Sequence, residues 1–311
     1  MFYSYKNIKI HYQVIGSGKP IFMIHGLDCD LNLMKGCFEP IFKNKNGYKR
    51  IYIDLPGMGK SEALLEYASS DKILDILISF AENIISENFL LIGESYGGYL
   101  SRGILSKLNS KIDGMALLCP VVTPIHAKRD VPKNIIKFED KDFMNTLNDF
   151  ERKTFGKFSV LENKKVYKRY KNEILSGIKK CNKDFIESLW KNYSFSFDVD
   201  KKLKKIKFDK PVLFMAGRQD ICVGYKDLYK LLEDYPRATF SVIDIAGHNL
   251  QIEQPELFNS LVENCNTLLN IFSLSVLAIL APTLDDNIII VIPEAILIAA
   301  NISILNPATI I

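Results

Sequence analysis

A serine near the first third of the chain stands in a pattern typical of a nucleophile. Ser95 is the central residue of a Gly-x-Ser-x-Gly motif that runs from Gly93 to Gly97. The apolar residues 89–92 predict a buried strand before it, and the apolar spacing over 99–108 predicts a helix after it. A sharp turn between strand and helix pushes a serine hydroxyl into a cleft, and glycines let the two elements approach closely. The motif therefore predicts an activated serine, although ordinary glycine-rich turns also produce it.

A serine nucleophile needs a base within hydrogen-bond reach and an acid that orients the base. The chain has four histidines, and His248 stands in the loop after the last predicted strand. Asp220 stands in the loop after the preceding strand. Because parallel strands end at one edge of a sheet, both side chains are expected at the same edge as Ser95. The order Ser95, Asp220, His248 is one in which such triads occur.

The elements that must position these residues are visible as short apolar runs alternating with segments of helical spacing. Strands are predicted at 2–5, 8–14, 21–24, 48–53, 89–92, 112–118, 211–216 and 239–243. Helices are predicted at 30–43, 71–87, 99–108, 226–233 and 255–270. This alternation predicts a mostly parallel α/β sheet with helices on both faces and an antiparallel hairpin at its edge.

The alternation stops between residues 121 and 207. This segment is rich in lysine, has helical spacing and contains no strand-like run. It follows the carboxyl end of a strand, the edge at which such sheets bind ligands. We therefore expect it to form a helical cap over the site.

Five motifs in this order resemble those of the cap-bearing α/β-hydrolase fold family, which includes esterases, prolyl iminopeptidases and C–C hydrolases. They are His25-Gly26, Asp54-x-Pro-Gly-x-Gly-x-Ser61, Gly93-x-Ser95-x-Gly97, Gly217-x-x-Asp220 and Gly247-His248. The resemblance covers residues 1–270 and implies an eight-stranded sheet. It divides the chain into a core of 1–120 and 208–270, a cap of 121–207 and a tail of 271–311.

The resemblance also implies an oxyanion hole, formed by the backbone amides of Leu27 and Tyr96. The amide of Tyr96 is expected there on physical grounds too, because it opens the helix after the serine. His25 and Gly26 resemble the family's residues that shape the loop before Leu27. The turn over 54–61 is expected to be architectural.

Three further positions bear on which residue is the acid of the triad. Asp244 lies four residues before His248, but its place at a strand end favours a local turn with the backbone. Some relatives carry the acid after the strand that follows the serine's helix, where this chain has Cys119, which cannot serve. Glu94 is expected to point away from the cleft as a structural hydrogen-bond partner. Asp220 is therefore the predicted acid.

The expected activity is hydrolysis of an ester, thioester, lactone or related acyl bond through an acyl-enzyme. Ser95 would be the nucleophile, His248 the general base and then acid, and Asp220 the orienting carboxylate. A serine nucleophile excludes the family branches that attack through aspartate. No metal or cofactor is expected, since no Cys/His spacing is typical of zinc. The alternatives are an aminopeptidase of the prolyl iminopeptidase kind and a ligand sensor that keeps the triad.

Charge and cysteine usage bear on partners and location. The excess of lysine in the segment 121–207 fits either an anionic substrate or simply solvated helices, and no nucleic-acid motif accompanies it. The six cysteines are scattered without a C-x-x-C pair, and the first residues lack a signal-peptide pattern. We therefore expect a cytoplasmic protein that acts on a small-molecule acyl substrate.

The last 41 residues, 271–311, are apolar and differ sharply in composition from the rest. They contain Pro293 and Glu294, and no Lys or Arg flanks them. These features are poor for a membrane span, which needs about twenty apolar residues with few charges. A membrane-contacting anchor, an element that packs on the domain and an end without a role remain as alternatives.

Overall fold

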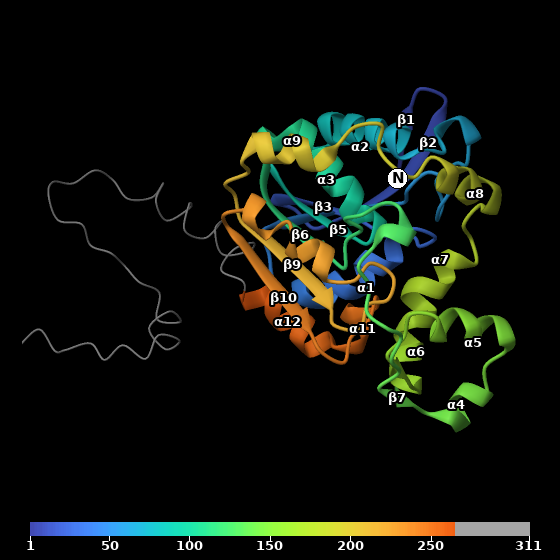
Figure 1. The fold of residues 1–311 in the computed structure, drawn as a ribbon. Coiled ribbons are helices and arrows are strands. Elements are labelled where there is room, and N and C mark those ends of the chain that lie inside the picture. Colours follow the sequence, from blue (N-terminus) through green and yellow to red (C-terminus); the bar gives the residue numbers. More distant parts are fainter. Residues whose placement is uncertain (265–311) are drawn as a thin grey trace, which may run out of the picture. The chain divides into compact units, whose positions relative to one another are not determined.

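The computed structural model describes residues 1–264, and Figure 1 shows their arrangement. Eight strands form one sheet in the order β1-β2-β4-β3-β5-β6-β9-β10. Their bounds are β1 Phe2–Tyr5, β2 Ile8–Ile15, β3 Lys19–Ile24, β4 Tyr48–Ile53, β5 Phe89–Glu94, β6 Ile112–Leu118, β9 Val212–Gly217 and β10 Ala238–Ile243. Strand β2 pairs antiparallel with β1 and β4, and the other neighbours are parallel. The predicted mostly parallel eight-stranded sheet is confirmed.

Helices cover both faces of this sheet, as predicted. Helices α2 (Ser70–Ile84), α3 (Tyr96–Leu108) and α9 (Val199–Ile206) pack together on one face, the upper one in Figure 1. Helices α1 (Leu31–Phe42), α11 (Leu250–Glu253) and α12 (Pro255–Asn264) lie on the other. With both faces covered, every residue of β5 is buried, which explains its uninterrupted apolar run before Gly93.

Helix α2 illustrates how the sequence produces these elements. It begins after Ser69, whose hydroxyl accepts a hydrogen bond from the Lys72 amide and so caps the first turn. Ile73, Leu77 and Phe80 recur at intervals of three and four and are fully buried. Such spacing places them on one face of the helix, which packs toward the sheet.

The segment 121–207 is mostly helical. Its helices are α4 (Lys141–Asn145), α5 (Asp149–Gly156), α6 (Lys164–Tyr170), a π-helical turn Lys171–Leu175, α7 (Ser176–Ile178), α8 (Lys183–Lys191) and α9. It also contains a parallel pair of two-residue strands, β7 (Phe138–Glu139) and β8 (Leu161–Glu162), where the sequence predicted none. Two residues are too few to produce an alternating apolar pattern, so sequence periodicity does not indicate these strands.

Helix α9 falls within the predicted cap, yet it packs on α3, the helix that covers one face of the sheet. The division of the chain into a core and a cap stays a prediction. Between β9 and β10 lies a short helix, α10 (Lys226–Tyr229). Within residues 1–264, no helix is long and apolar enough to cross a membrane. The tail 271–311 and the predicted end of the last helix at 270 lie outside the described residues.

Candidate active site

Ser95 occupies the tight turn between β5 and α3. Its φ of 51° lies in the left-handed region, a strained conformation for a residue with a side chain. The surrounding backbone is too close for any Cβ at the flanking glycines. A Cβ on Gly93 would lie 2.4 Å from the Gly97 carbonyl oxygen, and one on Gly97 would lie 2.2 Å from that of Ile24. The two motif glycines are therefore required by this turn.

The three predicted triad residues come together at the carboxyl ends of their strands. The Nε2 atom of His248 lies 2.9 Å from the Ser95 hydroxyl, and its Nδ1 atom lies 2.9 Å from Oδ2 of Asp220. An ionised carboxylate only accepts hydrogen bonds, so Nδ1 carries the proton and Nε2 accepts from the serine hydroxyl. Asp220 is completely buried, and its other oxygen accepts from the amides of Cys222 and Val223 at 2.8 and 3.1 Å.

Two opposing effects set the charge of His248. Burial by itself would lower the pKa of this imidazole. The negative charge of Asp220, its hydrogen bond and the neighbouring Cys222 thiol outweigh burial and raise the pKa of His248 well above its usual value. The neutral imidazole of His248 therefore binds a proton more readily than an ordinary histidine side chain does.

The loop after β3 faces the serine, as the oxyanion-hole prediction requires. Gly26 approaches so closely that a Cβ on it would lie 3.1 Å from that of Ser95. His25 is fully buried and bridges two backbone segments: Nδ1 donates to the Gly26 carbonyl at 2.7 Å, and Nε2 accepts from the Leu55 amide at 3.0 Å. These bonds fix the path of the loop into Leu27, which lines the pocket.

The two other acidic residues considered beside the triad, Asp244 and Glu94, lie in different surroundings. Asp244 is exposed and accepts a hydrogen bond from the Gln219 side chain at 2.6 Å, so it is tied to a local turn. Glu94 does not point away from the cleft, and that expectation was wrong. It lines the pocket, and its Oε1 atom lies 3.7 Å from Nε2 of His248. No local pattern in the sequence distinguished the two orientations.

A pocket of about 390 Å³ opens over Ser95 and His248. Many of the residues that line the pocket come from the segment 121–207. Those that are apolar or aromatic are Val121, Phe158, Tyr170, Ile174, Ile178, Trp190 and Tyr193. Cationic side chains of Arg129 and Lys157 also line it. A concave, mainly apolar cavity with a few polar groups is the usual form of a small-molecule site.

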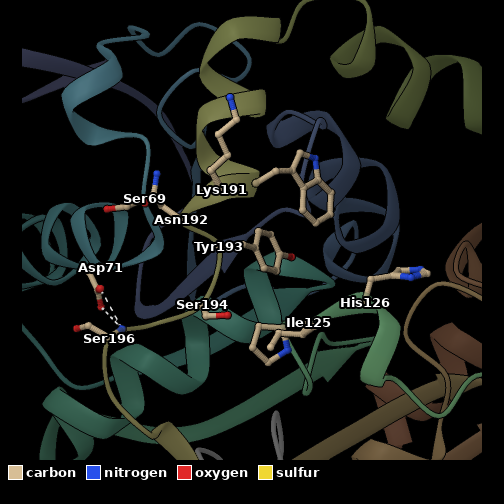
Figure 2. Close-up of a pocket in the computed structure, with 11 residues that line it drawn as sticks. Ser69, Asp71, Ile125, His126, Lys191, Asn192, Tyr193, Ser194 and Ser196 are labelled. Atoms are coloured by element: carbon tan, nitrogen blue, oxygen red, sulfur yellow. Dashed lines mark hydrogen bonds between the residues drawn. The ribbon is translucent and has the colours of Figure 1, made fainter.

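A second, more open cleft of about 700 Å³ adjoins this pocket, and Figure 2 shows its lining. Three residues, His126, Trp190 and Tyr193, line both the cleft and the pocket. The Trp190 ring stacks on Tyr193 with centroids 4.8 Å apart and is 48% exposed. On the far side of the cleft, Asp71 accepts hydrogen bonds from the Ser196 amide. The shared residues connect the reacting atoms with the outer cleft.

One group of possible metal ligands lies at the site. Ligand atoms of Cys119, Asp220 and His248 lie within 4.8 Å of one another. The hydrogen bond between Asp220 and His248 already engages one of these atoms on each residue, and burial raises the pKa of the Cys119 thiol well above its usual value. A neutral thiol is a weak ligand, so we assign this cluster to the serine site.

Comparison with known proteins identifies the family. Residues 19–255 match the family model described as alpha/beta hydrolase fold, and the chain belongs to this family. The predicted family, fold and enzyme class, an α/β hydrolase, are thereby confirmed.

Individual relatives agree with this assignment. The chain is 36% identical to an alpha/beta superfamily hydrolase of known structure from Oenococcus oeni PSU-1, with a TM-score of 0.76 over 85% of this chain and 97% of that one. It is 24% identical over 262 residues to a 2-hydroxy-6-oxononadienedioate/2-hydroxy-6-oxononatrienedioate hydrolase from Paraburkholderia phymatum, covering 82% of this chain and 90% of the relative. An esterase structure from Exiguobacterium antarcticum shares the fold, with a TM-score of 0.64, 22% identity and coverage of 83% and 95%.

Proposed function

We propose that the protein is a serine hydrolase that cleaves an ester, thioester, lactone or related acyl bond through an acyl-enzyme on Ser95. One observation carries this proposal. Asp220, His248 and Ser95 form a continuous hydrogen-bonded chain, with both imidazole nitrogens 2.9 Å from their partners. The chain ends at the serine hydroxyl, in a pocket large enough for a small acyl group.

Each residue has a definite step in this reaction. His248 takes the proton of the Ser95 hydroxyl as the oxygen attacks the carbonyl carbon, and Asp220 stabilises the imidazolium that forms. The amides of Leu27 and Tyr96 donate to the oxyanion. His248 then gives its proton to the departing oxygen, sulfur or nitrogen, which leaves the acyl group on Ser95. Water, deprotonated by His248, attacks the acyl carbon and releases the acid and the free serine.

A second candidate comes from the curated relatives, whose named substrates are dienedioates and trienedioates with two carboxylate groups. The cations Arg129 and Lys157 on the pocket wall favour such an anionic substrate. The guanidinium of Arg129 is held in place by the carbonyls of Thr123, Pro124 and Cys222 at 2.8–3.1 Å. A fixed cation of this kind can select an acid over a neutral ester.

The test begins with a fluorophosphonate probe, which reacts covalently with activated serines. We expect the probe to label the protein and Ser95→Ala to abolish labelling, with kcat on p-nitrophenyl esters lowered by at least about 10³-fold. The matched control is Ser101→Ala, because Ser101 is buried in the same helix and its hydroxyl donates to the Gly97 carbonyl of that helix.

The outcomes separate the candidates. Labelling that survives in Ser95→Ala would contradict the proposal. Faster turnover of a dienedioate than of any p-nitrophenyl ester would favour the second candidate. Ligand retention without turnover of either class would favour a sensor.

A further inference from the structure

A second carboxylate faces the imidazole of His248. Asp220 contacts Nδ1 at 2.9 Å, and on the opposite side Oε1 of Glu94 lies 3.7 Å from Nε2. Glu94 is the last residue of β5 and is only 3% exposed. The imidazole therefore lies between two buried acidic side chains, one of which the proposed reaction has not used.

The residues around position 94 satisfy only part of its carboxylate. Its Oε2 atom is buried and makes no hydrogen bond with any residue in the described range 1–264. Glu253 provides a contrast in the same molecule, because its buried carboxylate accepts from the amides of Val160, Leu161 and Gly247. A buried carboxylate oxygen without a partner costs folding free energy, so the contact of Glu94 with the Gly26 amide does not by itself account for an acid at this position.

We propose that Glu94 is a positioning residue that stabilises the protonated form of His248 while that imidazole holds the serine proton. The inference rests on the proposed role of His248 as general base. Once His248 has taken the proton, Nε2 carries a positive charge beside the Glu94 carboxylate. At 3.7 Å between two largely buried side chains, this attraction is stronger than in bulk solvent. Glu94 forms and breaks no bond in the reaction.

The ionisation of Glu94 falls in the working range of such a base. Burial raises the pKa of Glu94 to about 7, Asp220 adds to the increase, and His248 and the Gly26 amide oppose it. Glu94 and His248 therefore titrate as a coupled pair. The other titratable or charged groups around them are Asp220, the pocket-lining side chains of Asp28, His126, Arg129 and Lys157, and the thiols of Cys29, Cys37, Cys119 and Cys222. These groups stay the same in the variants below.

The sign of the effect follows from the charge. A negative neighbour favours the imidazolium, so removing it lowers the pKa of His248 and leaves the base neutral, and active, at lower pH. The same removal weakens the stabilisation of the imidazolium in the transition state. Glu94→Gln should therefore extend activity toward acid while lowering the maximal rate. A purely structural role would lower the rate without moving the pH profile.

The experiment measures kcat/KM on a short p-nitrophenyl ester across pH, with active enzyme counted by fluorophosphonate labelling. We expect Glu94→Gln to move the acid-side midpoint down by about one pH unit and to lower the plateau kcat about tenfold. Glu94→Asp keeps the negative charge but holds it farther from the imidazole. Its midpoint and its plateau kcat should therefore lie between those of Glu94→Gln and those of the unchanged protein. The control is Glu162→Gln, which removes a buried acid outside the pocket whose pKa burial also raises, and its midpoint should match that of the unchanged protein.

An unchanged midpoint in a fully labelled Glu94→Gln protein would overturn the inference. If that variant does not fold, Glu94→Asp decides in the same way, since a shift toward acid supports the inference and an unmoved midpoint refutes it. Failure of the proposed function looks different, because Ser95→Ala would then keep its activity.

Discussion

The replacement Asp220→Asn tests the geometry of the site most directly. Oδ1 of Asp220 accepts hydrogen bonds from the amides of Cys222 and Val223 at 2.8 and 3.1 Å. In the variant, the amide oxygen of asparagine should keep this position, because only an oxygen can accept these two bonds. The NH₂ group must then face Nδ1 of His248, where the carboxylate oxygen lies now.

The consequence is the wrong tautomer of the imidazole. Since an NH₂ group only donates, Nδ1 must give up its proton and accept, and the proton moves to Nε2. Nε2 lies 2.9 Å from the Ser95 hydroxyl and can no longer take its proton. We expect kcat to fall about 10⁴-fold, or about 5 kcal/mol in the activation barrier. Folding should persist, because both backbone bonds of the loop survive.

The assay compares kcat on a short p-nitrophenyl ester with thermal unfolding of the same samples. Asp244→Asn is the matched control, because Asp244 is exposed and contacts Gln219 rather than the imidazole. That variant should keep its full rate. The reasoning would be refuted by a folded Asp220→Asn protein with nearly unchanged kcat, or by a large loss in Asp244→Asn.

Two further predictions follow from the site. The raised pKa of His248 keeps the base protonated at acidic pH, so kcat/KM of the unchanged protein should rise with pH through a midpoint above the ordinary histidine value of 6.5; a midpoint at or below that value would contradict the electrostatic account. Trp190→Ala removes the ring shared by the pocket and the outer cleft, so KM for esters with long or bulky groups should rise about tenfold, a loss of about 1.4 kcal/mol, while a small fluorophosphonate still labels Ser95. Equal losses for small and large esters would argue against a role of the cleft in binding.

The sequence by itself determined the parts of the protein that depend on local chemistry. The glycines around Ser95 predicted a tight turn, in which a residue with a Cβ would clash with the backbone. The apolar runs predicted strands that are covered on both faces. The order of strand ends along the chain placed Ser95, Asp220 and His248 at one edge. Each of these signals depends on residue type and short-range spacing, which are properties of the chain alone.

The tertiary structure decided everything that depends on distance between remote segments. Ser95 and His248 are 153 residues apart, and only the pairing of β5, β6, β9 and β10 brings their loops within a hydrogen bond. The same pairing separates Asp220 from Asp244, which look alike in the sequence, by burying one and exposing the other. Glu94 faces His248 for the same reason, since its orientation depends on neighbours that no local pattern reveals. The residue type determines which chemical groups a side chain carries. The fold around the side chain determines its partners and its charge state.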